Sequence, residues 1–154
     1  MIDLIRKSYA LLIAAASSLQ SVLLLIVRLY WGWQFMETGL GKLQHLEKVT
    51  KFFTSLGIPA PGLNAGFVSG LELVGGILLA VGLASRLVSL LFVGDMLVAY
   101  FTADREAFLA FISDPDKFVG AAPCTFLCAS LLILIFGPGR FSLDAVLARW
   151  FVKR

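Results

Sequence analysis

Three ionisable side chains stand inside long apolar runs of this sequence: Arg28, Glu72 and Asp95. A charge at the centre of a lipid bilayer costs roughly 2.5–3.5 kcal/mol even on the lenient insertion scale, so such residues face one another or a polar cavity. Each lies eight or nine residues inside its apolar run, which corresponds to a depth of about 12–14 Å along a helix. The sequence therefore predicts that the three side chains meet at one level near the middle of the membrane.

This predicted polar level has two interpretations. As a functional site, it would relay protons or bind a substrate head group or a quinone. As a structural element, it would be an ion-pair network that joins three helices, because an arginine between two carboxylates already has its partners. The residue types and their depths favour the two interpretations about equally.

A second group of polar and aromatic residues lies around the end of the first apolar run and includes Trp31, Lys42 and His45. Tryptophans at such a position are mostly interfacial anchors, and a binding role for Trp31 and Lys42 is the alternative. His45 is the only histidine, so no metal site is predicted. The sequence also has no glycine-rich phosphate or dinucleotide motif, so no nucleotide cofactor is predicted.

Cys124 and Cys128 are four residues apart and share a face of the predicted helix. In a regular helix such Cβ atoms are about 5–6 Å apart, whereas a disulfide needs about 3.5–4.5 Å. The shorter Cys-X-X-Cys redox spacing is absent. We therefore expect two buried thiols and not a redox pair.

The composition indicates a membrane protein. Hydrophobic residues make up 59% of the chain and charged residues 15%, against about 45–50% and about 25% in soluble domains. The mean hydropathy is +0.90. The net charge of +3 does not indicate nucleic-acid binding, because the basic residues stand at the ends of apolar runs and form no stripe.

The predicted fold class is all-α: an integral membrane four-helix bundle in a single domain, residues 1–154. The spans are expected at about 19–40, 63–83, 87–103 and 121–136, each near the length that crosses a hydrocarbon core of about 30 Å. Glycines and prolines in residues 57–62 interrupt any helix there. Only Ala84-Ser85-Arg86 joins the second and third spans, so these two must form an antiparallel hairpin.

Shorter elements are expected at both ends of the chain. The first 18 residues predict an interfacial amphipathic helix, with a signal peptide as the alternative. After Gly137-Pro138-Gly139, a short C-terminal helix is expected to begin with Ser142 as its cap. Seven Lys and Arg residues lie on the side of both termini and five on the other. This asymmetry predicts a multi-pass protein of the bacterial inner membrane with both termini in the cytoplasm.

Several short motifs occur in an order that resembles the DoxX family of small four-helix bacterial membrane proteins. They are Arg28, Gly39-Leu40-Gly41-Lys42-Leu43, Leu56-Gly57-Ile58-Pro59, Gly70-Leu71-Glu72-Leu73-Val74-Gly75-Gly76, Gly82-Leu83-Ala84-Ser85-Arg86, Met96 with Ala99, and Gly137-Pro138-Gly139-Arg140-Phe141-Ser142-Leu143-Asp144. The resemblance implies a link to redox metabolism, because the family is named after the membrane subunit of a thiosulfate:quinone oxidoreductase. The positions that match the family pattern are Arg28, Lys42, Glu72 and Arg86, and the lack of a Cys-X-X-Cys pair argues against disulfide exchange.

The leading hypothesis is a membrane subunit of a quinone-linked oxidoreductase or respiratory assembly. No covalently bound cofactor is expected, quinone is the candidate cofactor, and the expected partners are the lipid bilayer and other membrane subunits or a second copy of the chain. The alternative is a structural or assembly subunit without its own chemistry, in which small-residue helix faces dock onto a larger complex. Small-solute transport is the weaker third hypothesis, because four short helices enclose little space.

Overall fold

The computed structural model describes residues 2–152, and the side chains of residues 5–150. The described part consists of helices and connecting loops, without strands. The helices are α1 Ile2–Gln44, α2 Leu46–Ser55, α3 Pro61–Val81, α4 Ser85–Thr102, α5 Arg105–Leu109, α6 Pro115–Gly120, α7 Ala122–Phe136 and α8 Leu143–Val152. Within the described residues, three helices are long and apolar enough to cross a membrane, and α7 is a shorter apolar helix. The protein is an all-α membrane protein, as the sequence predicts.

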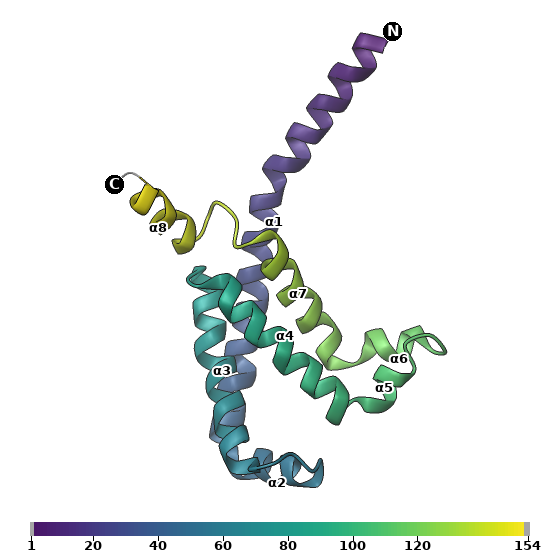
Figure 1. The fold of residues 1–154 in the computed structure, drawn as a ribbon, viewed down its shortest axis with the longest axis vertical. Helices are drawn as coiled ribbons and strands as arrows, with labels where there is room; N and C mark the ends of the chain where they lie inside the picture. Colours follow the sequence, from purple (N-terminus) through teal and green to yellow (C-terminus); the bar gives the residue numbers. More distant parts are fainter. Residues whose placement is uncertain (1, 153–154) are drawn as a thin grey trace.

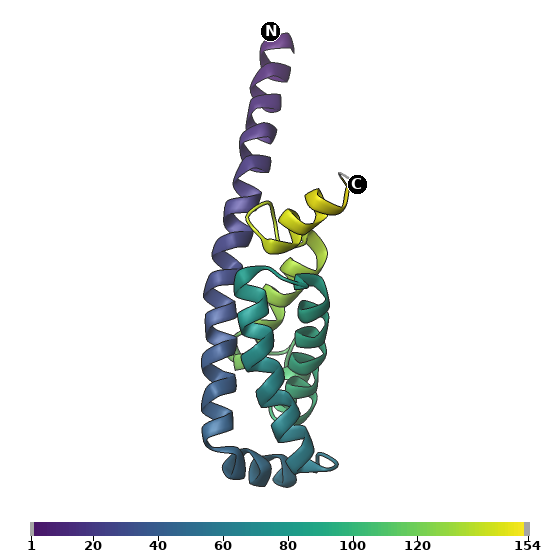
Figure 2. The same cartoon turned by 90° about the vertical axis from the view of Figure 1, so that its left-hand side faces the viewer.

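Helix α1 is a single continuous helix of 43 residues. No glycine or proline occurs in it before Gly32, so nothing in the backbone interrupts the helix. Its N-terminal part projects beyond the other helices (Figures 1 and 2), and the side chains of residues 5–20 are all exposed. The segment expected as a separate interfacial helix is therefore the first part of α1.

Helices α1 and α3 lie side by side and antiparallel, and α2 crosses one end of this pair (Figure 2). Small residues allow the close approach. A Cβ atom added to Gly76 would lie 2.6 Å from the carbonyl oxygen of Gly32, and one added to Gly32 would lie 2.8 Å from that of Gly76. Close backbone contact of this kind at small residues is a common way to pair helices in membranes.

Residues 82–84 form the turn between α3 and α4, with Gly82 and Ala84 in the left-handed region at φ values of 75° and 50°. From this turn the two helices diverge, and α4 packs instead against α7 (Figure 1). The predicted antiparallel hairpin is confirmed. Helices α3 and α4 therefore enclose a wedge-shaped space that widens away from their turn. Helix α2 and the loop after it lie across the wide end of this wedge.

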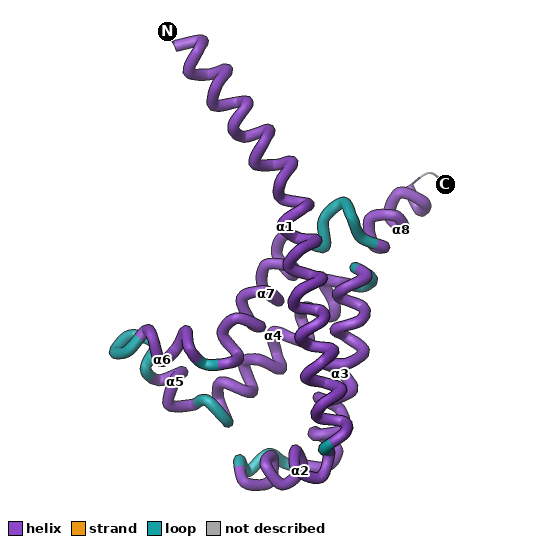
Figure 3. The backbone as a smooth tube through the Cα atoms, turned by 180° about the vertical axis from the view of Figure 1, so that it is seen from behind, coloured by secondary structure: helices purple, strands orange, loops and turns teal. Residues whose placement is uncertain are grey.

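Aromatic rings join three of the helices at the centre. Phe35 of α1 stacks on Phe92 of α4 with ring centroids 3.6 Å apart and an angle of 6°, and Phe126 of α7 meets Phe35 edge-on at 4.7 Å. The short helices α5 and α6 lie toward the same end of the molecule as α2, while α8 lies at the opposite end (Figure 3). Both described ends of the chain are at the α8 end (Figure 1).

Candidate functional site

The candidate site is built around an ion pair between α1 and α3. Lys42 Nζ donates to Glu72 Oε1 at 2.7 Å, and the side chains are 34% and 3% exposed, respectively. Glu72 is held on the buried face of α3, which also contains the small residues Ser69, Gly75 and Gly76. Lys42 stands in the last turn of α1. Its long side chain reaches from the helix end to a carboxylate that the small residues leave accessible.

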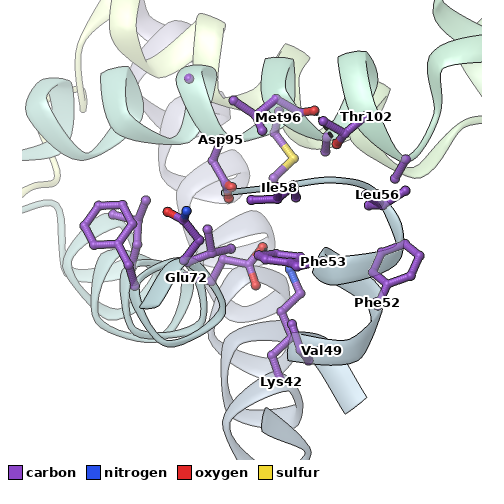
Figure 4. A pocket seen from close by; sticks show the side chains of 18 of the residues that line it. Lys42, Val49, Phe52, Phe53, Leu56, Ile58, Glu72, Asp95, Met96 and Thr102 are labelled. Carbon is purple, nitrogen blue, oxygen red and sulfur yellow. Dashed lines mark hydrogen bonds and ion pairs between the residues drawn. The ribbon is translucent and has the colours of Figure 1, made fainter. Parts of the chain in front are cut away.

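Asp95 of α4 completes the group of charges. Its side chain points toward Glu72 across the space between α3 and α4 (Figure 4). Oε2 of Glu72 and Oδ2 of Asp95 are buried and have no hydrogen-bond partner in the described structure. Buried acceptors without a donor are uncommon and costly in folded proteins. The site therefore holds one basic and two acidic groups, with acceptor capacity left over.

These three side chains are among those that line a cavity of about 580 Å³. Apolar residues make up most of the remaining wall, among them Phe53, Ile58 and Met96 (Figure 4). The volume lies in the range of about 300–1,000 Å³ that is usual for pockets that bind small molecules. The combination of apolar walls with a few converging polar groups is also typical of such pockets.

Some residues of the cavity lining are also exposed on the outside of α3 and α4. Phe67 of α3 and Leu91 and Val98 of α4 line the cavity, and these residues are 63%, 43% and 53% exposed on the outer surface of their helices. Since α3 and α4 diverge from their turn (Figure 1), the cavity lies in the wedge between them. The exposed part of the lining thus stands on two helices that are long and apolar enough to cross a membrane.

Arg28 is not part of this group. Its guanidinium donates to the carbonyl oxygens of Pro138 at 2.7 Å and Phe141 at 2.8 Å, with a longer contact to that of Ala80 at 3.4 Å. The expectation that Arg28, Glu72 and Asp95 meet at one level is therefore wrong for Arg28. The prediction placed its depth by counting from residue 19, but α1 extends far beyond the bundle, so Arg28 lies at the level of the α3–α4 turn.

Arg28 instead holds together two segments that are distant in the sequence. Gly82 has no room for a side chain, because an added Cβ would collide with the guanidinium of Arg28 and with Ser142. Asp144 accepts hydrogen bonds from the backbone N–H groups of Ala84 at 2.7 Å and Ser85 at 2.8 Å, and so caps the start of α4. We call Arg28, residues 82–85 and residues 138–144 the clasp. It joins α1, the α3–α4 turn and the C-terminal segment.

The start of the C-terminal helix follows the prediction. Ser142 Oγ accepts a hydrogen bond from the backbone N–H of Ala145 at 3.1 Å, which is the usual geometry of an N-terminal cap. Gly137 and Gly139 both have a φ of 79°, a conformation that favours glycine. The motif after α7 thus ends one helix, supplies carbonyls to Arg28 and begins the next helix.

Comparison with known proteins agrees with this arrangement. The sequence model of the DoxX family matches residues 23–105, which is more than half of the chain. The protein belongs to the DoxX family. The matched region contains Arg28, Lys42, Glu72 and Asp95, whereas residues 138–144 of the clasp lie outside it.

One relative is the "Putative oxidoreductase CatD" of Bacillus subtilis (strain 168), which is 36% identical over 83 residues. The alignment covers 54% of this chain and 60% of the relative, so it spans less than two thirds of that protein. No solved structure matches the chain significantly.

The remaining predicted residues of this DoxX-family protein lie away from the cavity. Trp31 packs edge-on against Phe126 with ring centroids 4.8 Å apart and is absent from the cavity lining. Cys124 is buried, Cys128 is exposed, and both are free thiols. The expectation that both thiols are buried is therefore wrong for Cys128. Among residues 2–152, no group of three or more His, Cys, Asp or Glu side chains is placed to bind a metal.

Reasoning from the sequence missed the cavity wall formed by α2, because it predicted no helix between the spans at about 19–40 and 63–83. A signal was present, because the apolar residues of this segment recur at helical spacing. They are Val49, Phe52, Phe53 and Leu56. All four line the cavity. The pairing of Lys42 with Glu72 was also missed, since the distance between helices is not visible in the sequence.

Proposed function

We propose that this DoxX-family protein is the membrane component of a quinone-linked oxidoreductase system, and that the cavity between α2, α3 and α4 binds the quinone. The observation that supports this most is the cavity of about 580 Å³, whose mostly apolar lining includes Lys42, Glu72 and Asp95. A quinone has a polar ring on an apolar tail. The cavity offers polar groups for the ring and apolar walls for the tail.

Different residues of the cavity would contact the oxygens and the faces of a quinone ring. The ammonium group of Lys42 has three N–H donors and gives one to Glu72, so others are available for a ring oxygen. Phe53, Ile58 and Met96 line the space beside the charged groups and would contact the faces of the ring. The electron donor or acceptor would belong to a partner subunit, because the quinone itself only carries the electrons.

We place the protein in the bacterial cytoplasmic membrane with both termini on the cytoplasmic side and with α7 as a fourth span. The two described ends of the chain lie at the same end of the molecule (Figure 1). The sequence has seven Lys and Arg residues in the segments on the side of both termini and five in those on the other side, not counting Arg28, which favours a cytoplasmic location for the termini. Helix α7 has 15 residues and is about 22 Å long, so a thinner or locally adapted bilayer would accommodate it.

The test uses a substitution that fills the cavity without disturbing the packing. Gly94 lines the cavity, and a Cβ added there meets nothing within 4 Å. Gly66 on α3 is equally open but does not line the cavity. Gly94→Leu should therefore block a ligand, whereas Gly66→Leu is the matched control.

The protein would be isolated from its native membrane in a mild detergent, and co-purifying proteins and lipid-soluble molecules would be identified by mass spectrometry. We expect near-stoichiometric quinone in the wild type and in Gly66→Leu, and a loss of most of it in Gly94→Leu. Equal quinone in all three samples would mean that the cavity is not the site. No quinone in the wild type would contradict the proposal.

A structural or assembly subunit is the second candidate function. The observation that favours it is the exposed apolar surface on the projecting part of α1, where Tyr9, Leu11 and Leu12 are 64%, 71% and 64% exposed. Another membrane subunit or a second copy of the chain would cover this surface. A constant protein partner in the same purification, together with an absence of quinone, would favour this function.

A further inference from the structure

The polar end of the cavity has more hydrogen-bond acceptors than donors, and this imbalance bears on which form of a quinone it prefers. We infer that the cavity binds the reduced hydroquinone more tightly than the oxidised quinone, with Asp95 as the residue that discriminates between them. The inference rests on the proposed quinone site and adds the redox state of its ligand.

The acceptors are two carboxylate oxygens. Oε2 of Glu72 and Oδ2 of Asp95 are buried and accept no hydrogen bond. Both residues line the cavity, and Figure 4 shows the Asp95 side chain directed toward Glu72 across it. A ligand group placed between them would therefore lie near two acceptors at once.

Two of the three side-chain donors in the cavity lining, Asn64 and Thr102, are engaged with backbone carbonyl oxygens. Asn64 Nδ2 donates to the carbonyl oxygen of Pro59 at 2.6 Å, and Thr102 Oγ1 donates to that of Val98 at 2.7 Å. Lys42 gives one N–H to Glu72 Oε1 and retains others. In the described structure none of these donors pairs with Oε2 of Glu72 or Oδ2 of Asp95.

The two redox forms of a quinone differ in what they can offer here. Both ring oxygens of the oxidised form only accept hydrogen bonds, whereas the hydroxyl groups of the reduced form donate as well as accept. Either form can accept from Lys42, so Lys42 does not distinguish them. With Asp95 and Glu72 ionised, both carboxylates only accept hydrogen bonds. Only the hydroquinone can then donate to Asp95 or Glu72, while the quinone would place its oxygens against unpaired carboxylate oxygens.

The oxidised quinone leaves a buried carboxylate oxygen unpaired, whereas the hydroquinone pairs with it. The cost of one unpaired buried acceptor corresponds to a difference of about tenfold or more between the dissociation constants of the two forms. Tenfold tighter binding of the reduced form raises the two-electron midpoint potential of the bound couple by about 30 mV. The site would thus make the bound quinone easier to reduce than the free quinone.

The experiment measures the affinity of the purified full-length protein in lipid nanodiscs for a short-tail ubiquinone analogue. One titration uses the oxidised analogue, and the other uses the same analogue kept reduced with dithionite under anaerobic conditions. We expect a dissociation constant at least tenfold lower for the reduced form. Gly94→Leu should weaken binding of both forms, because it fills the shared space.

Asp95→Asn is the decisive variant, since it keeps the shape and replaces an acceptor oxygen by an amide that donates N–H groups. It should reduce the preference for the hydroquinone at least fivefold, chiefly by improving quinone binding. Asp116→Asn makes the same chemical change at an exposed position on α6 and should leave the ratio unchanged. Thermal unfolding of each variant checks that the fold is intact.

The outcomes separate this inference from the proposed function. Equal affinities for the two forms in the wild type would overturn the preference and leave the quinone site standing. A preference that survives Asp95→Asn unchanged would overturn the role of Asp95. Binding of neither form would overturn the quinone site and this inference with it.

Discussion

The strongest structural prediction concerns Arg28, whose charge the structure uses in the clasp and not in the cavity. We expect Arg28→Ala to release the C-terminal segment and to leave the cavity formed. Two short hydrogen bonds, 2.7 Å to Pro138 and 2.8 Å to Phe141, would be lost. Bonds to a charged group contribute about 1.5–3 kcal/mol each, so the loss amounts to about 3–6 kcal/mol.

This loss can be measured at the loop itself. Arg140 is exposed within the loop that Arg28 holds, so trypsin cleavage after Arg140 reports local opening. A loss of about 3–6 kcal/mol raises the open population by roughly 10²–10⁴-fold. We therefore expect cleavage after Arg140, followed by mass spectrometry, to be at least 100-fold faster in Arg28→Ala. Cleavage after Arg149 in α8 gives an internal reference.

Arg86→Ala is the matched control, since Arg86 lies beside the same segment but makes a single long contact, 3.4 Å to the carbonyl of Ile135. It should change the cleavage rate only a few-fold. The reasoning would be refuted if Arg28→Ala left cleavage after Arg140 unchanged. It would also be refuted if the variant lost bound quinone while the loop stayed protected, because Arg28 would then act at the cavity.

Three further predictions concern stability, measured as the free energy of unfolding. Lys42→Met leaves the carboxylate of Glu72 buried without its partner. Loss of a buried ion-pair partner costs about 3–5 kcal/mol, and the partial exposure of Lys42 makes the expected loss smaller than this. Adding Glu72→Gln should recover much of the lost stability. Gly76→Ala should cost about 1–3 kcal/mol, because the added methyl forces α1 and α3 apart, while Gly66→Ala at an open helical position should stabilise by up to about 1 kcal/mol. Asp144→Ala removes the cap of α4 and should cost about 1–2 kcal/mol.

The outcomes that would contradict these predictions are equally specific. A neutral Lys42→Met would mean that the carboxylate finds another donor, and failure of the double variant to recover stability would mean that lysine packing matters more than its charge. If Gly76→Ala and Gly66→Ala behaved alike, close backbone contact would not hold α1 against α3. A neutral Asp144→Ala would assign the stability of the clasp to Arg28 alone.

Helical periodicity predicted which face of α3 is buried. Ala65, Ser69, Glu72, Gly75 and Gly76 recur at helical spacing in the sequence, and all five are buried in the structure. This succeeded because residues three and four apart share a helical face whatever the helix packs against. The all-α membrane class and the α3–α4 hairpin were predictable for the same local reason.

The partner of Glu72 was not predictable in this way. The apolar stretch of α1 covers Ile5–Gln44, about 60 Å of helix, or twice the hydrocarbon thickness of about 30 Å. Hydropathy therefore leaves open which part of α1 lies beside α3. The contact between Gly32 and Gly76 decides this register, and it places Lys42 beside Glu72 and Arg28 at the turn.

The sequence by itself thus determined the membrane class, the helices and the buried face of α3, because these depend on composition and on spacing within one segment. Tertiary structure alone decided the Lys42–Glu72 pair, the clasp and the cavity closed by α2. Each of these depends on the relative position of helices along their axes. That position is set by packing between residues far apart in the chain, which no periodicity within a single helix records.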